Sequence, residues 1–176
     1  MLSPKEDPLN NRIYQFTNIK DSHTSAASAS PRAPIRVLVA EDGFANRQLA
    51  LRLLQREGHS VTAVRTGVHA VRELRYRDFD LVLMDIEMPG MDGLSATRAI
   101  RAWERETGGH TPIVALTSNN DPEKCFSAGM DGFLSKPLQI DELKFLLRRC
   151  SQATSLEREY HAGQQQIGRA SCRERV

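Results

Sequence analysis

The chain has few cysteines, no long hydrophobic run and almost no net charge. Its three cysteines, Cys125, Cys150 and Cys172, show no paired or metal-like spacing, which argues against a disulfide framework and favours a reducing setting. No apolar run approaches the roughly 18 residues of a membrane span, and the first residues lack the apolar segment of a signal peptide. We therefore expect a cytoplasmic protein with no membrane segment in this chain.

The small net charge also argues against nucleic acid as a partner. Lysine and arginine total 24 against 22 acids, and the pI is about 8.5. Residues 166–176 resemble a translated sequencing adapter, and without their three arginines and one glutamate 21 basic and 21 acidic residues remain. The remaining arginines, including Arg47, are interspersed with acids, so we interpret them as parts of solvated helix faces and expect no nucleic acid to bind.

The length of 176 residues allows one domain of ordinary size with tails. Residues 1–34 have no sustained period and become rich in Ser, Ala and Pro, which predicts a disordered linker. Regular patterning covers residues 35–150, the predicted domain. Residues 151–165 form a polar tail, and residues 166–176 are excluded as a probable adapter artefact.

Short apolar runs alternate with helical patterns five times along the predicted domain. This alternation predicts an α/β fold, a doubly wound parallel sheet of five strands with helices on both faces. The runs are apolar throughout, as expected for strands covered on both sides. The predicted strands are residues 35–40, 61–64, 81–84, 113–116 and 132–135.

Helix ends are marked by residues with well-understood capping roles. Gly58 is expected to end the first helix, Asp92 to cap the third, and Asp121 with Pro122 to begin the fourth. Apolar residues at helical spacing give the faces that should meet the core. These are Leu49, Ala50, Leu53 and Leu54; Val68, Val71 and Leu74; Ala96, Ile100 and Trp103; and Leu143, Leu146, Leu147 and Cys150.

Polar residues follow the strands at the edge where their carboxyl ends should meet. These are Glu41 and Asp42, Asp85, Thr117 and Lys136. Clustered carboxylates repel each other, and a hard divalent cation such as Mg²⁺ relieves this repulsion while binding phosphate oxygens. A hydroxyl and an ammonium can then stabilise a transferring phosphoryl group, with Asp85 as the nucleophile.

Taken together, these motifs resemble those of a response-regulator receiver domain, of the type fused to hybrid histidine kinases. The matching segments are Glu41-Asp42, residues 84–93 (Met-Asp-Ile-Glu-Met-Pro-Gly-Met-Asp-Gly), residues 115–118 (Ala-Leu-Thr-Ser) and residues 128–137, which end in Lys-Pro. The resemblance covers residues 35–149. It implies a flavodoxin-like sheet with strand order 2-1-3-4-5, and it favours a C-terminal fragment of a hybrid histidine kinase.

The resemblance also implies a role in phosphorelay signalling. Asp85 would accept a phosphoryl group from a phosphohistidine on a histidine kinase or a histidine phosphotransfer protein. Asp42 and Asp85 would bind Mg²⁺ directly, Glu41 through water and Glu87 through its main-chain carbonyl. Such a domain is not an enzyme in its own right, although it removes its own phosphate.

The remaining positions acquire roles in the same way. Lys136 would pair with the phosphoryl group, and the Lys136–Pro137 peptide would be cis. Thr117 and Phe133 would act as the switch, while Glu87 and Asn119 would tune dephosphorylation. From the residues alone, Phe133 could equally be a core phenylalanine, and Glu87 and Asn119 could be solvated loop residues.

One spacing departs from the family pattern. Thr117 and Lys136 are 19 positions apart, about three fewer than is usual, so the fourth helix or its leading loop is expected to be about one turn short. The alternative function is a pseudo-receiver, which would bind a partner without being phosphorylated. A transcription factor would need a DNA-binding domain after the receiver, and a nucleotide enzyme would need a Gly-rich phosphate loop, which the sequence lacks.

Overall fold

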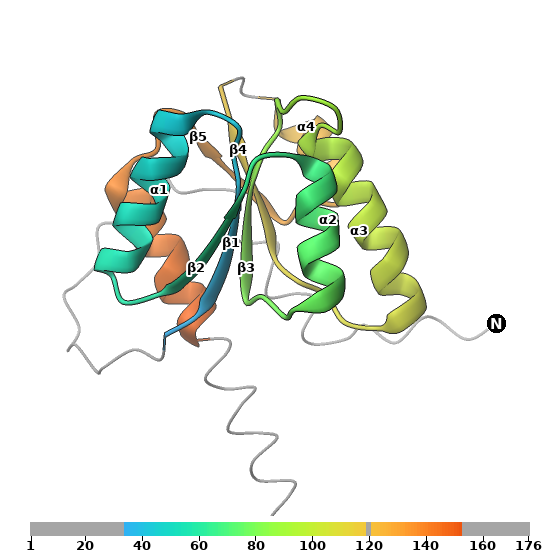
Figure 1. Cartoon of the computed structure of the whole chain (residues 1–176), viewed down its shortest axis with the longest axis horizontal. Coiled ribbons are helices and arrows are strands. Elements are labelled where there is room, and N and C mark those ends of the chain that lie inside the picture. Colours follow the sequence, from blue (N-terminus) through green and yellow to red (C-terminus); the bar gives the residue numbers. More distant parts are fainter. Residues whose placement is uncertain (1–33, 119–120, 153–176) are drawn as a thin grey trace, which may run out of the picture.

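The computed structural model describes residues 34–118 and 121–152, in which strands and helices alternate (Figure 1). The last helix of this part covers residues 140–152. The other elements are β1 (Arg36–Ala40), α1 (Phe44–Arg56), β2 (Ser60–Val64), α2 (Gly67–Tyr76), β3 (Leu81–Asp85), α3 (Gly93–Thr107), β4 (Ile113–Thr117), α4 (Pro122–Ser127) and β5 (Gly132–Ser135). In the part of the chain described, no helix has the length and apolarity needed to span a membrane.

The strands form one parallel sheet of five, in the order β2-β1-β3-β4-β5, which confirms the predicted fold and strand order. Val37 pairs with Leu81, and Val82 pairs with Ile113, so β1, β3 and β4 run side by side in a common direction. The carboxyl ends of these strands therefore share one edge, called the carboxyl edge below. The polar residues that the sequence places after the strands are brought to this edge.

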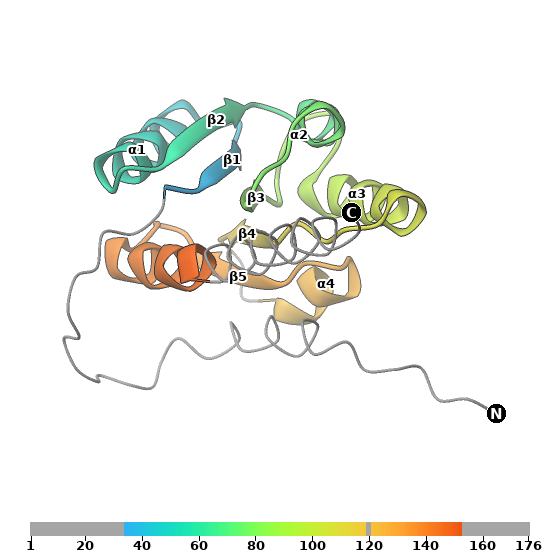
Figure 2. The same cartoon turned by 90° about the horizontal axis from the view of Figure 1, so that it is seen from below.

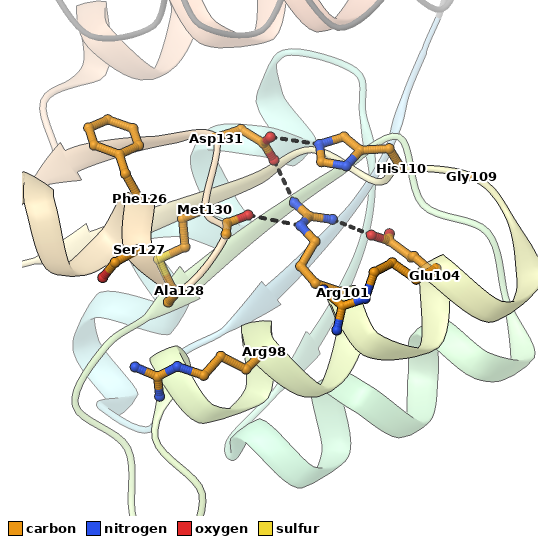
Figure 3. A pocket seen from close by; sticks show the side chains of 12 residues that line it. Arg98, Arg101, Glu104, Gly109, His110, Phe126, Ser127, Ala128, Met130 and Asp131 are labelled. Atoms are coloured by element: carbon orange, nitrogen blue, oxygen red, sulfur yellow. Dashed lines mark hydrogen bonds and ion pairs between the residues drawn. The ribbon is translucent and has the colours of Figure 1, made fainter. Parts of the chain in front are cut away.

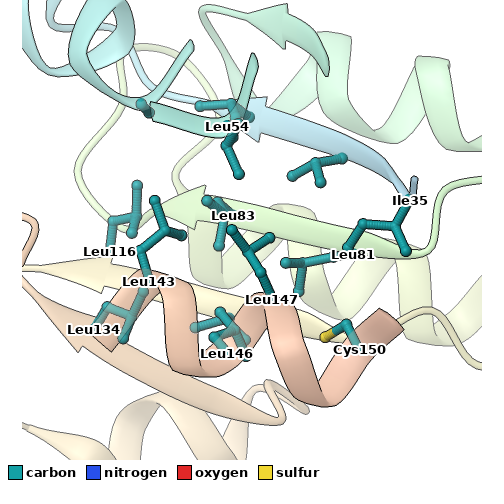
Figure 4. Packing of buried hydrophobic residues seen from close by; sticks show 14 residues of the cluster. Ile35, Leu54, Leu81, Leu83, Leu116, Leu134, Leu143, Leu146, Leu147 and Cys150 are labelled. Carbon is teal, nitrogen blue, oxygen red and sulfur yellow. The ribbon is translucent and has the colours of Figure 1, made fainter. Parts of the chain in front are cut away.

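Helices cover both faces of the sheet (Figure 2). On one face, α1 and the last helix pack over a cluster that includes Leu54, Leu83, Leu116 and Leu146 (Figure 4). On the other face, α2, α3 and α4 enclose a second cluster of buried side chains. All five residues of β3 are buried, whereas the edge strand β2 is half-buried, so complete coverage holds only for the inner strands.

Several helix ends follow the capping chemistry expected from the sequence. The Asp92 carboxylate accepts a hydrogen bond from the Ser95 N–H at 2.6 Å and caps α3. Asp121 accepts one from the Lys124 N–H at 3.4 Å, with Pro122 in the first turn of α4. Gly58 follows α1 with φ of 86°, a conformation that costs glycine little.

Two residues expected in the core face solvent. Leu49 on α1 is 41% exposed and Val68 on α2 is 54% exposed. The buried faces are centred elsewhere, on Ala50 and Leu54 in α1 and on Ala70 and Leu74 in α2. Each misplaced residue lies next to its buried face, because neighbouring positions on a helix are about 100° apart.

Helix α4 is short, as its spacing in the sequence predicted. It has six residues, against 15 in α3 beside it. At about 1.5 Å per residue, α4 is about 9 Å long and α3 is about 22 Å long.

Candidate functional site

Three carboxylates meet at the carboxyl edge of the sheet. Glu41 and Asp42, called the acid pair below, follow β1, and Asp85 is the last residue of β3. One oxygen from each of the three carboxylates lies within 4.8 Å of the other two. Glu41 and Asp85 are buried and Asp42 is half-buried. The convergence predicted from the strand order is therefore present in the structure.

Lys136 supplies the positive charge at this site. Its Nζ lies 2.8 Å from Glu41 Oε2 and 2.8 Å from Asp85 Oδ2, and its side chain is 18% exposed. The lysine follows β5, and its main-chain N–H donates to the Thr117 carbonyl at the end of β4 at 2.8 Å. The peptide bond to Pro137 is cis, as expected. The lysine is thus held by the sheet itself, with its ammonium directed at the carboxylates.

The site holds more negative than positive charge, and the pKa values of both Asp85 and Lys136 are raised. Burial raises the pKa of Asp85, and repulsion from Glu41 adds to the rise, although the ammonium of Lys136 opposes it. Burial by itself lowers the pKa of Lys136, but the close contacts of its ammonium with the carboxylates of Asp85 and Glu41 outweigh that effect and raise it. Lys136 is therefore a firmly charged cation, whereas Asp85 binds a proton more readily than an ordinary aspartate.

The backbone around Asp85 is tightly packed. The Glu87 N–H donates to Asp85 Oδ1 at 3.2 Å, which orients the carboxylate. Gly93, the first residue of α3, lies so close that a Cβ added there would be 2.1 Å from the Asp85 carbonyl oxygen. Only glycine allows α3 to begin this close to the end of β3. The start of α3 and the end of β3 thus form one packed unit.

The acid pair is held by side chains that the sequence did not single out. Arg47 Nη1 donates to the main-chain carbonyls of Glu41 and Asp42, each at 2.9 Å. Asn46 Nδ2 donates to Glu41 Oε1 at 3.3 Å, and the Gly43 N–H donates to the same oxygen at 3.2 Å. Interpreting Arg47 as part of a solvated helix face was therefore wrong. The sequence held one indication of this role, because Arg47 lies in the first turn of the helix that follows the acid pair.

The other predicted site residues are placed as follows. Thr117 is buried at the end of β4, on the same edge as Asp85. Phe133 in β5 is partly buried and meets Phe126 edge to face, with ring centroids 6.4 Å apart. Glu87 is exposed beside Asp85. Asn119 lies outside the described residues.

The donor set suits a hard divalent cation. The carboxylate oxygens of the acid pair and Asp85 are the ligand type that Mg²⁺ prefers. Glu41 Oε2 is buried and has no well-aligned hydrogen bond, although Lys136 Nζ is its ionic neighbour. An added positive charge would satisfy this oxygen and offset the repulsion that raises the pKa of Asp85. The residues present therefore fit a magnesium ion.

Comparison with known proteins agrees with this geometry. The family model of the response regulator receiver domain matches residues 37–148. The sensor protein GacS of Pseudomonas syringae pv. syringae is 48% identical over 118 residues, which cover 65% of this chain and 13% of that protein. The chain thus spans about an eighth of the length of this relative.

Solved structures show the same arrangement of the chain. The receiver domain of sensor histidine kinase PA1611 from Pseudomonas aeruginosa, with magnesium in its active site cleft, has a TM-score of 0.62 and 39% identity, over 68% of this chain and 99% of that one. The receiver domain of Ssk1 from Saccharomyces cerevisiae, crystallised with the histidine phosphotransfer protein Ypd1, has a TM-score of 0.62 and 26% identity, over 65% of this chain and 87% of that one. Since the family model covers more than half of the sequence, the chain belongs to the response regulator receiver domain family.

Proposed function

We propose that this chain is a phosphorelay module that accepts a phosphoryl group on Asp85. The observation that carries the proposal is the contact of Asp85 Oδ2 with Lys136 Nζ at 2.8 Å, beside the acid pair. A nucleophilic carboxylate, a fixed cation and a cluster of metal-binding oxygens are the parts that phosphoryl transfer needs. The family and its relatives support this assignment.

In the proposed reaction an oxygen of the Asp85 carboxylate attacks the phosphorus of a phosphohistidine. The new P–O bond forms as the P–N bond breaks, and the electron pair of that bond returns to the imidazole of the donor. Lys136 then exchanges its contact with Asp85 for one with a phosphoryl oxygen, so that its charge stays paired. The Glu87 N–H holds Asp85 Oδ1 in place during the attack.

We propose that Asp42 and Asp85 hold Mg²⁺ directly, that Glu41 acts through water, and that the main-chain carbonyl of Glu87 completes the protein ligands. When bound, the ion neutralises charge on the carboxylates and on the phosphoryl oxygens. Arg47 keeps the acid pair in position through the two main-chain carbonyls that it binds. The structures with magnesium in other receiver domains support this choice of metal.

Further residues are proposed to respond to the phosphoryl group. The Thr117 hydroxyl is proposed to donate to a phosphoryl oxygen, because Thr117 ends the strand beside β3. Phe133 is proposed to move inward behind it, from its present contact with Phe126. Glu87 and Asn119 are proposed to flank the path of the hydrolytic water, and the exposed position of Glu87 supports this for one of the two.

The phosphoryl donor is proposed to be a histidine kinase or a histidine phosphotransfer protein. The relatives include hybrid signal transduction histidine kinases, and the solved complex of the Ssk1 receiver with Ypd1 supports a phosphotransfer protein as partner. We propose that the chain is the receiver part of such a kinase, that it works in the cytoplasm, and that it is a substrate of phosphotransfer rather than an independent enzyme. No contact with nucleic acid is required.

The functional unit is proposed to be residues 35–150. The match of the family model to residues 37–148 supports these bounds. Residues 1–34 are proposed to be a linker, residues 151–165 a polar tail and residues 166–176 an adapter-derived segment. These three segments lie outside the described residues, apart from residues 34, 151 and 152.

The pseudo-receiver alternative has no support from the site. A receiver that only bound a partner could do without an acid or the lysine, because nothing would select for phosphoryl chemistry. Here Asp85, the acid pair and Lys136 are all present and in contact. The site is equipped for phosphorylation.

The test is the intact mass of the whole chain after incubation with acetyl phosphate and Mg²⁺. We expect one phosphoryl adduct on the wild type, none on Asp85→Asn, and none when EDTA removes the metal. Asp141→Asn, which changes an exposed aspartate on the last helix, is the matched control and should still be modified. An adduct that persists in a folded Asp85→Asn variant would contradict the proposal.

A further inference from the structure

A cleft lies between α3 and the turn from α4 to β5, away from the carboxyl edge (Figure 3). It has a volume of about 570 Å³ and is bounded by the later part of α3, by Gly109 and His110 before β4, and by residues 126–131. Helix α4, which precedes the turn, has only six residues, against 15 in α3. The volume of the cleft falls in the range of small-molecule sites.

Three arginines of α3 line this cleft: Arg98, Arg101 and Arg105. Positions that differ by three and by four residues lie on the same face of a helix, so these side chains form one stripe. A helix face uncovered by its neighbour is expected to be polar, but alternating charges would suffice for solubility. Three arginines against one acid, Glu104, on this face of α3 leave an excess of positive charge, which favours an anion.

The acids of the cleft are already bonded to the central arginine. Arg101 pairs with Glu104 and, at 2.6 Å, with Asp131, and both carboxylates are nearly buried. Asp131 also accepts from the Ile113 N–H at 2.7 Å and contacts the His110 ring at 2.6 Å. Two carboxylates thus share the guanidinium of Arg101, and both are engaged in hydrogen bonds inside the protein rather than in ion pairs with the outer two arginines.

Arg98 and Arg105 are exposed at the two ends of the stripe. Among the described residues neither has a carboxylate within ion-pair distance. The N-cap Asp92 interacts with Arg98 only weakly, because its pKa is lowered mainly by the Ser95 N–H and less by the charge of Arg98. Two guanidinium groups thus border a cleft that already contains satisfied acids.

We propose that this cleft binds a small molecule that carries at least two phosphate groups, held by Arg98 and Arg105. Guanidinium groups bind phosphate oxygens in pairs, and Arg98 and Arg105, which start about 10 Å apart along α3, have long side chains that can converge on one ligand in the cleft between them. Phe126, which is partly exposed, lines the same cleft and offers an apolar surface for the organic part of the molecule. This site is independent of the phosphoryl acceptance proposed for Asp85.

The test uses the whole chain in EDTA, with inorganic pyrophosphate as the probe and backbone amide NMR as the readout. We expect saturable shifts at Gly109 and Gly129, with none centred on Asp85. The variant Arg98→Gln/Arg105→Gln should weaken binding by at least about tenfold, as expected for lost charged hydrogen bonds. Inorganic phosphate should bind more weakly than pyrophosphate.

The matched control is Arg52→Gln/Arg56→Gln, which removes two exposed arginines of α1 and should leave the affinity unchanged. Shifts spread over arginines of several helices, or equal weakening in both double variants, would mean only nonspecific attraction and would overturn the proposal. Equal affinity for phosphate and pyrophosphate would also overturn it. Both substituted pairs are exposed, and amide spectra without ligand verify that the variants are folded.

Discussion

Replacing Arg101 by methionine tests how strongly the buried ion network stabilises the fold. The guanidinium lies where α3 meets the starts of β4 and β5 (Figure 3), and it is 11% exposed. It contacts Glu104 and Asp131, which are 5% and 9% exposed, and donates to the Gly129 carbonyl at 2.8 Å and the Thr111 carbonyl at 2.9 Å. Arg101→Met keeps the apolar stem and removes only the charge and its donors.

The expected cost follows from the two carboxylates that lose their cation. Breaking a buried ion pair costs about 3–5 kcal/mol, because the partner charge stays buried and unpaired. Glu104 would keep the Thr111 N–H at 2.8 Å, and Asp131 would keep the Ile113 N–H, so the lower end applies. We expect the free energy of unfolding to fall by about 3 kcal/mol, which lowers the urea midpoint by about 2 M at a slope of about 1.5 kcal/mol/M.

Equilibrium urea unfolding followed by circular dichroism measures this loss. Arg105→Met, one turn further along α3 and exposed, is the matched control and should change stability by less than about 0.5 kcal/mol. Glu104→Gln should lower the free energy of unfolding less in the Arg101→Met variant than in the wild type, because the glutamate has already lost its cation there. A loss below about 1 kcal/mol for Arg101→Met would refute the reasoning.

Three further perturbations test other parts of the account. Asp92→Ala should cost about 1 kcal/mol at neutral pH by thermal unfolding. The pKa of the Asp92 carboxylate is lowered in the folded state, chiefly by the Ser95 N–H. The stabilisation by this carboxylate is therefore present above its unfolded-state pKa and is lost as the pH falls through its folded-state pKa. In Asp92→Asn this pH-dependent contribution should be absent. Gly93→Ala should cost about 1–3 kcal/mol and broaden the Asp85 amide signal, because a Cβ would press on the Asp85 carbonyl; an unchanged spectrum would contradict this. Arg47→Gln should weaken Mg²⁺ binding measured by calorimetry while exposed Arg52→Gln does not, since only Arg47 holds the acid pair.

The strands and their order could be predicted because a buried parallel strand needs a continuous apolar run. The starts of β3 and β4 were predicted at Leu81 and Ile113, where they lie, and β5 was predicted residue for residue. In β3 and β4 the predicted ranges stopped one residue early, before the polar residues Asp85 and Thr117. Those residues still pair within the sheet, although their side chains belong to the site.

Helix orientation and the support of the site were harder to predict. Leu49 and Val68 fit a helical period but lie beside the buried face of their helices. The period alone does not fix which side of a helix faces the sheet. Arg47 looked like one of several surface arginines, since its binding to two main-chain carbonyls depends on how the loop after β1 turns. The cleft beside α3 and the ion pairs of its acids depend on how α3 meets the turn from α4 to β5, which the sequence pattern does not show.

The most direct test of the central claim is to locate the phosphoryl group on the chain. The whole protein is phosphorylated with acetyl phosphate and Mg²⁺ and then reduced with sodium borohydride, which converts an aspartyl phosphate to homoserine. Peptide mapping by mass spectrometry then identifies the modified position. We expect homoserine at position 85 alone, in the peptide that contains the end of β3. Homoserine at another acid, or none after a confirmed adduct, would contradict it.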